Sequence, residues 1–140
     1  MSSGQNDTRP MSPFTTIWRW HVTMVTSILH RLSGIVLAAG SVLIASWLFA
    51  LAIGEKQYDQ LMNVIANWPG QIILFGFTLA LFFHLLNGVR YLLWDSGRGF
   101  EKSTANLTSW LVMGMAVILS LALWAAGFWM LEAFPGQNNY

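Results

Sequence analysis

The chain has 140 residues, of which 55% are hydrophobic and only 9% are charged. Because soluble domains carry about 25% charged residues, this composition favours a membrane protein in contact with lipid. A net charge of +1 argues against a nucleic-acid partner, and the lack of cysteine excludes a disulfide scaffold and thiolate-held iron–sulfur or zinc sites within the chain.

The first residues, MSSGQNDTRPMSPFTT, are polar and lack the apolar core of a secretory signal peptide. They are also too short and too poor in arginine for a mitochondrial transit sequence, which favours a bacterial protein. We expect a cytoplasmic segment over residues 1–26, a transmembrane domain over 27–134 and a short tail over 135–140.

Three uncharged stretches follow, at residues 32–54, 60–89 and 103–131. Each exceeds the roughly 20 residues that a helix needs to cross a membrane. Because Pro69 suits a helix start, we expect helices over about 27–53, 71–94 and 104–132, joined by short polar connections. The sequence therefore predicts an all-α membrane protein with three transmembrane helices.

The distribution of basic residues predicts the orientation. Arg9, Arg19 and Arg31 lie in or near the N-terminal segment, and Arg98 and Lys102 lie in the second connection. The first connection has one lysine against two acidic residues, and the tail has no basic residue. We therefore expect a multi-pass protein of the bacterial inner membrane, with a cytoplasmic N-terminus and a periplasmic C-terminus.

His84 lies within the second predicted helix, eleven residues before Asp95, or roughly 16 Å from that helix end. An imidazole at this depth needs a partner, and a haem iron, a proton pathway or a hydrogen bond to another helix would each serve. Gly88, one turn further on, would let a flat macrocycle lie against the helix, or would simply allow close helix packing.

Ser27, His30, Arg31 and Gly34 share one helical face at the start of the first predicted helix. This face could hold haem propionates or a quinone carbonyl. Alternatively, His30 and Arg31 are interfacial residues whose side chains reach the lipid headgroups.

His30 and His84 should not share one iron. By helical rise, His84 lies about ten residues deeper, a gap on the order of 10 Å or more, whereas two axial nitrogens lie only about 4 Å apart. A haem at His84 would need its other ligand from another chain. For Arg90, six residues further on, we expect Asp95 as the first choice of partner, then another subunit, then a haem propionate.

Three segments carry a family resemblance: RPMSPFTTIWRW, SILHRLSG and HLLNGVRYLLWDSG. In this order they resemble the family of cytochrome b556 membrane-anchor subunits of succinate dehydrogenase, respiratory complex II. The likeness runs from Arg9 to Gly97, and the third predicted helix matches only in length and apolar character. Two departures are Phe14, where histidine is frequent, and Tyr91, where many relatives have a second histidine.

The resemblance implies half of a two-chain, haem-binding helical bundle. A flavoprotein subunit oxidises succinate, an iron–sulfur subunit carries the electrons, and quinone is reduced at the membrane. This chain and a second small three-helix anchor subunit would share one haem b, with His84 as an axial ligand to the iron and Gly88 packing against the haem. Ser27 and Arg31 would line the quinone site, and the propionate side of the haem would face three residues: His30, Arg31 and Tyr91.

Two alternatives remain open from the residues. One is a haem-free structural anchor of a related quinol oxidoreductase, in which His84 only packs. The other is a small transporter or channel subunit with His84 in a proton path.

Overall fold

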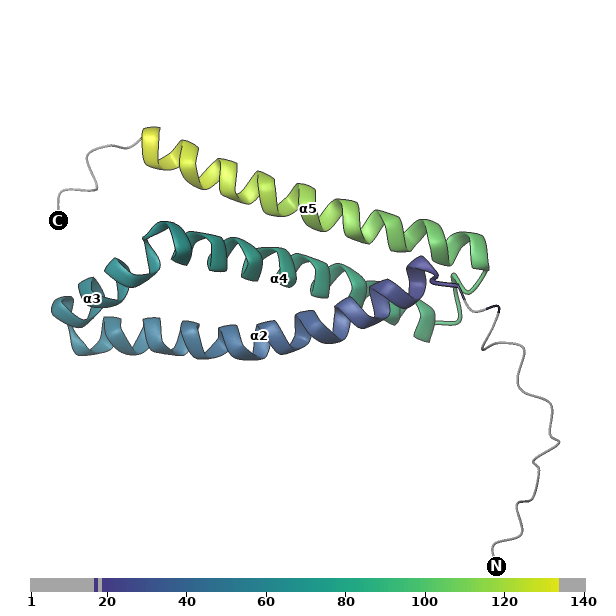
Figure 1. Cartoon of the computed structure of the whole chain (residues 1–140), viewed down its shortest axis with the longest axis horizontal. Helices are drawn as coiled ribbons and strands as arrows, with labels where there is room; N and C mark the ends of the chain where they lie inside the picture. The colour runs from purple at the N-terminus through teal and green to yellow at the C-terminus, as the bar shows by residue number, and fades with distance from the viewer. Residues whose placement is uncertain (1–16, 18, 134–140) are drawn as a thin grey trace, which may run out of the picture.

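The computed structural model describes Ile17 and residues 19–133. This part of the chain is helical, without strands, and its long helices run side by side (Figure 1). The helices are α2 (Val22–Ile53), α3 (Glu55–Ile65), α4 (Trp68–Asp95) and α5 (Lys102–Ala133). The expected tail and most of the expected N-terminal segment, Phe14 included, lie outside the described residues.

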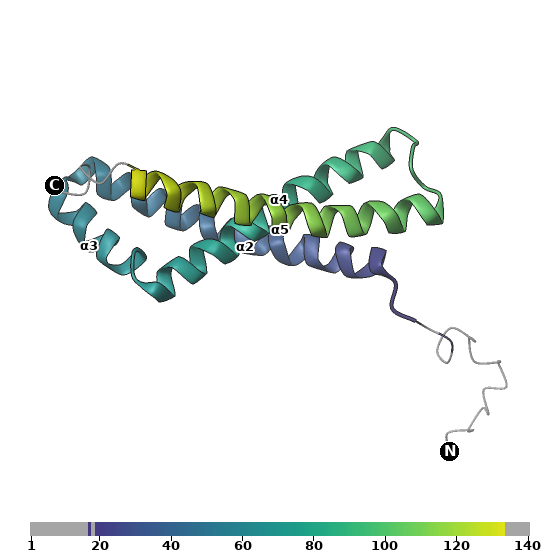
Figure 2. The ribbon, with the colours of Figure 1, turned by 90° about the horizontal axis from the view of Figure 1, so that it is seen from above.

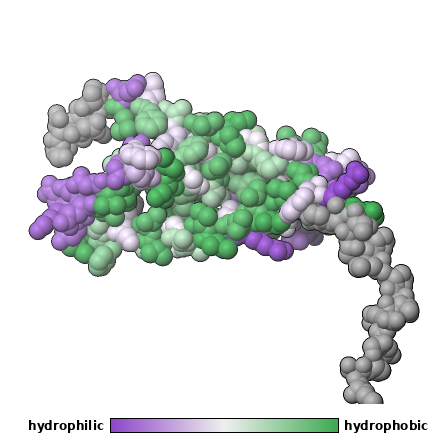
Figure 3. All heavy atoms as spheres, viewed as in Figure 1, coloured by the Kyte–Doolittle hydropathy of each residue, from purple (hydrophilic) through white to green (hydrophobic). Residues whose placement is uncertain are grey.

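Helices α2, α4 and α5 are each long and apolar enough to cross a membrane. Large apolar side chains cover their outer surfaces, and Figure 3 shows a hydrophobic band with hydrophilic residues toward both ends. Such a surface is costly in water and matches lipid hydrocarbon. The expected all-α architecture with three spans is confirmed.

Helix α4 is the central element and packs against both α2 and α5, crossing α2 obliquely (Figure 2). The buried core is small and centres on Phe83 of α4 and on Val112 and Ala116 of α5. The buried positions of α5 carry small side chains at intervals of three or four residues: Ala105, Ser109, Val112, Ala116 and Ser120. This stripe lets α5 approach its neighbours closely, as is usual where lipid gives no hydrophobic driving force between helices.

The helix ends explain the offsets from the expected boundaries. Helix α4 begins at Trp68 rather than near residue 71, because the Asn67 side chain caps it by accepting a hydrogen bond from the Gly70 amide at 2.9 Å. Helix α2 begins at Val22 rather than 27, and α5 begins at Lys102 rather than 104. After α4, Gly97 and Gly99 adopt positive φ angles of 80° and 82°, a conformation that favours glycine.

Helix α3 corrects the expectation of a polar connection between the first two spans. Its outward face is charged and polar, whereas four side chains on the other face are partly buried: Tyr58, Leu61, Met62 and Ile65. These four recur at helical spacing, so the segment is an amphipathic helix rather than a loop. Residues 60–65, which begin the second uncharged stretch, therefore belong to α3.

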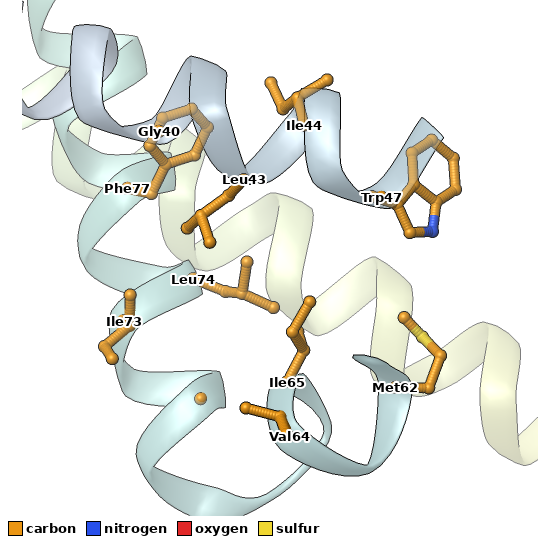
Figure 4. Close-up of a pocket in the computed structure, with 11 residues that line it drawn as sticks. Gly40, Leu43, Ile44, Trp47, Met62, Val64, Ile65, Ile73, Leu74 and Phe77 are labelled. Atoms are coloured by element: carbon orange, nitrogen blue, oxygen red, sulfur yellow. The ribbon is translucent and has the colours of Figure 1, made fainter. Parts of the chain in front are cut away.

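A pocket of about 410 Å³ lies where α3 folds back between α2 and α4 (Figure 4). Glycines and apolar side chains line it, and Leu43, Leu74 and Ile65 are among them. Gly40 is buried here against the ring of Phe77, so any larger residue at position 40 would collide with that ring. Its lining has no charged side chain and no histidine, and Met62 is its one side chain with a sulfur atom. The polar groups gather at the opposite end of α2 and α4.

Candidate functional site

His30 of α2 and His84 of α4 lie face to face, with ring centroids 4.1 Å apart and planes 11° from parallel. The expected gap of 10 Å or more between them is therefore wrong. It assumed that α2 starts near residue 27, whereas α2 starts at Val22 and crosses α4 obliquely, so that both rings reach one level. Stacked rings still do not point their nitrogens at each other across an iron, so this arrangement does not make them opposite ligands of one metal.

The hydrogen bonds of His84 define its tautomer. Its Nδ1 lies 3.2 Å from the backbone oxygen of His30, which can only accept, so Nδ1 carries the proton. The Ser33 hydroxyl, 3.0 Å from Nδ1, donates to the same backbone oxygen at 2.8 Å. Nε2 of His84 makes no hydrogen bond to any described residue, which leaves its lone pair available to a metal.

The surroundings of His84 fit a haem. A Cβ added at Gly88 would meet nothing within 4 Å, so open space lies beside the helix one turn from His84, whereas a Cβ at Gly34 would touch the His84 ring at 3.3 Å. Nε2 of His30 is buried without a hydrogen-bond partner among the described residues, as expected of a group awaiting an acceptor such as a carboxylate. The described residues hold no cluster of three or more His, Asp or Glu side chains that could bind a metal alone.

Tyr91 and Trp94 extend the aromatic contacts toward the end of α4. The Tyr91 ring meets His30 edge-on at 5.1 Å and Trp94 at 5.5 Å. Beside them lies a shallow hollow whose lining includes Ser27, Tyr91 and Trp94. The Ser27 hydroxyl makes no hydrogen bond within the described part of the chain, so it is available to a ligand.

The predicted site residues do not all converge. Ser27, His30 and Tyr91 lie near one another, and His30 links them to His84. Arg31 shares the helical face of Ser27 but is exposed, does not line the hollow, and has no ion pair among the described residues.

Arg90 is the second polar centre, and it does not bond Asp95 as expected. Only 4% exposed, it donates from Nε to the Thr108 hydroxyl at 3.0 Å and from Nη2 to the Ala105 backbone oxygen at 3.1 Å, both on α5. Arg90 faces the interior of the bundle, whereas Asp95 is exposed at the end of α4, five residues on and therefore on another face.

Four polar residues of these clusters were not singled out from the sequence: Thr26, Ser33, Asn87 and Thr108. Ser33 stands one turn after His30, and Asn87 one turn before Arg90, in otherwise apolar surroundings. That spacing was readable, because residues three apart share a helical face. The pairing with Thr108 was not, because it depends on how α4 meets α5.

The fold and the site define a class: a small, all-helical membrane protein with three spans and a polar cluster around two histidines at one end of the bundle. The family model described as "Succinate dehydrogenase/Fumarate reductase transmembrane subunit" matches residues 5–123.

Similar curated proteins include the succinate dehydrogenase cytochrome b556 subunits of Rickettsia bellii and Paracoccus denitrificans. The first is 39% identical over 116 residues, covering 83% of this chain and 90% of the relative. The second is 36% identical over 121 residues, with coverage of 86% and 93%. The human mitochondrial cytochrome b560 subunit of succinate dehydrogenase is 34% identical over 117 residues, covering 82% of this chain and 69% of that protein.

The chain belongs to the family of succinate dehydrogenase and fumarate reductase transmembrane subunits, and the resemblance seen in its sequence is confirmed. It is a membrane-anchor subunit, not itself the site of succinate oxidation. Its spans and its bacterial relatives place it in the inner membrane as a multi-pass protein.

Proposed function

We propose that this chain shares one haem b with a second small three-helix anchor subunit and contributes to the quinone-reducing site of a succinate dehydrogenase. The observation that carries the proposal is the state of His84. Its Nδ1–H is held by the His30 backbone oxygen, its Nε2 makes no hydrogen bond to a described residue, and open space lies beside α4 one turn on, at Gly88. The cytochrome b names of the relatives support the cofactor.

His84 would supply one axial nitrogen through Nε2, and the partner anchor would supply the other. A hydrogen bond from the remaining ring N–H fixes the orientation of a metal-bound histidine and raises its basicity, a role that the His30 oxygen would fill. His30 Nε2, Tyr91 and Arg31 would face the propionates. When bound, a haem supplies a one-electron carrier between the iron–sulfur subunit and the membrane.

Quinone reduction consumes two electrons and two protons at the carbonyl oxygens. The Ser27 hydroxyl, free of other hydrogen bonds, would donate to one carbonyl oxygen from the hollow beside Tyr91. Arg31, on the same helical face, would stabilise negative charge as it develops on that oxygen.

The remaining subunits would bind at the end of the bundle that carries Ser27. Family membership implies a flavoprotein and an iron–sulfur partner, and electrons from succinate must reach the quinone from the soluble side. We place the N-terminus and the α4–α5 connection in the cytoplasm, and α3 and the C-terminus in the periplasm, as the distribution of arginine and lysine indicates.

The haem assignment is tested by a reduced-minus-oxidised absorbance spectrum of the purified complex. We expect a b-type α-band that is lost in His84→Ala. The control is His21→Ala, because His21 is exposed before α2 and its ring bonds only the Arg19 backbone oxygen among the described residues, at 2.8 Å. A full-strength band in His84→Ala would refute the ligand, and no band in the unmodified complex would favour a haem-free anchor or a transporter subunit.

The quinone site is tested by two activities of one preparation. Ser27→Ala and Arg31→Leu should lower succinate–quinone turnover, by about a hundred- to a thousandfold for loss of a donor to a developing oxyanion, and spare succinate oxidation by an artificial soluble acceptor. Equal loss of both activities would mean failed assembly, and no loss of either would remove these residues from the site.

A further inference from the structure

Arg90 is a buried cation without a matching anion in the described part of the chain. It is 4% exposed within a membrane-spanning helix, and no carboxylate of the described residues pairs with it. A charge at such a place is expensive, and it persists only where neutral groups satisfy it or where the charge has a use.

Neutral groups from all three spanning helices surround the guanidinium. Nε and Nη2 of Arg90 bond to α5, as described above. Nη1 donates to Asn87 Oδ1 of α4 at 3.1 Å and to the Thr26 hydroxyl of α2 at 3.4 Å. Trp94 covers the group, with its ring centre 4.1 Å from Cζ. These contacts give each nitrogen of the guanidinium at least one acceptor but leave the charge in place.

The same contacts hold α2 against α4 next to the histidine pair. On α2, Thr26 lies two turns before Ser33, with His30 between them. Thr26 contacts Arg90 of α4 and Ser33 contacts His84 of α4, so the two polar contacts lie on either side of His30. Along α4, Arg90 stands six residues from His84, an axial offset of about 9 Å.

We propose that Arg90 is a positioning residue of the haem site, which fixes the three helices around His84 and whose unneutralised charge favours the reduced haem. This inference rests on the proposed function. With an effective dielectric constant of about 20, a unit charge about 10 Å from a one-electron carrier shifts the ratio of its reduced to oxidised form by roughly tenfold.

Redox titration of the haem in the purified complex separates the charge from the hydrogen bonds. Arg90→Gln should lower the ratio of reduced to oxidised haem at a fixed applied potential by roughly tenfold, about 59 mV for a one-electron couple. In Arg90→Lys, which keeps the charge, the ratio of reduced to oxidised haem should stay near that of the unmodified complex. Arg98→Gln is the control, because that arginine is exposed beyond the end of α4, where solvent screens it.

Asn87→Asp provides a second route to the same result. Asn87 is fully buried, its Oδ1 already accepts from Arg90, and its Nδ2 has no partner among the described residues. An aspartate of the same shape would neutralise Arg90 without removing it, so the ratio should fall as in Arg90→Gln. An unchanged ratio in both variants, or an equal fall in Arg90→Lys, would overturn the role of the charge.

The helix-fixing role has a readout that needs no haem. The chain has no cysteine, so a single Ser109→Cys substitution can be followed by maleimide labelling and the mass of this chain within the complex. Ser109 is fully buried one turn from Ala105, and labelling should be weak and should rise several-fold when Arg90→Gln is added. Ser103→Cys, at an exposed position, should label equally in both backgrounds. Unchanged labelling at position 109 would overturn this role. Absence of haem would refute the proposed function and the role of the charge with it, but not the helix-fixing role.

Discussion

The Ser33 hydroxyl should strengthen haem binding without touching the haem. It is 6% exposed and sits between two groups, donating to the His30 backbone oxygen at 2.8 Å and lying 3.0 Å from Nδ1 of His84. Ser33→Ala removes one of the two acceptors of the Nδ1 proton and leaves the other, the His30 oxygen at 3.2 Å. The tautomer should therefore survive while the ring is held less firmly.

The size of the effect follows from one lost hydrogen bond. Such a bond contributes about 0.5–1.5 kcal/mol, which corresponds to roughly two- to tenfold in affinity, since about 1.4 kcal/mol is tenfold. Loss of an outer-shell partner of a metal ligand usually costs about 10- to 100-fold. Because the His30 oxygen remains as an acceptor, we expect a value near tenfold.

The assay is the rate at which haem leaves the purified complex for a haem-scavenging protein. Ser33→Ala should release haem about tenfold faster than the unmodified complex, with its α-band at first present. Ser41→Ala is the matched control, because the Ser41 hydroxyl bonds only the Ala38 oxygen of its own helix, at 2.7 Å. Equal release rates in the Ser33→Ala and Ser41→Ala complexes would show that the His84–Ser33 contact does not support a ligand.

Two further predictions concern packing and orientation. Gly40→Leu should destabilise the bundle by about 1–3 kcal/mol through overpacking against Phe77, measured as a lower melting temperature of the complex. Phe77→Ala should partly restore it, and Gly76→Ala, whose new Cβ would meet nothing within 4 Å, is the control; equal melting temperatures in Gly40→Leu and Gly76→Ala would contradict the close packing at Gly40. A reporter enzyme fused after Tyr140 should be active in the periplasm, and a cytoplasmic signal would contradict the proposed orientation.

Hydropathy was sufficient to predict the spans, because a membrane helix needs only length and apolar composition. It was not sufficient for α3. That helix opens with Glu55, Lys56 and Gln57, and this polar start hides the apolar spacing of the residues that follow it. A helix of 11 residues with one apolar face raises no long hydrophobic peak, so only its periodicity could have revealed it.

The relation between His30 and His84 shows where counting residues fails. Rise per residue gives depth along one helix, but comparing two helices requires their starts and their crossing angle. The predicted start of the first helix was wrong, since α2 begins at Val22. The crossing angle of two helices cannot be read from sequence. Residues on one helix, such as Ser27 and Arg31, could be assigned to a common face, but packing decided that Ser27 lines a hollow with residues of α4 and Arg31 does not.

Arg90 shows the same limit for charge. Pairing it with Asp95 follows the logic of an aqueous surface, where two opposite charges near one helix end attract each other. Inside a bundle surrounded by lipid, hydroxyl, amide and backbone oxygens can satisfy a guanidinium without a second charge that must also lose its water. Thr26, Asn87 and Thr108 do this for Arg90, so no described residue cancels its positive charge. A bundle built in this way keeps a fixed cation near its histidine pair, where its positive charge would attract an electron that arrives there.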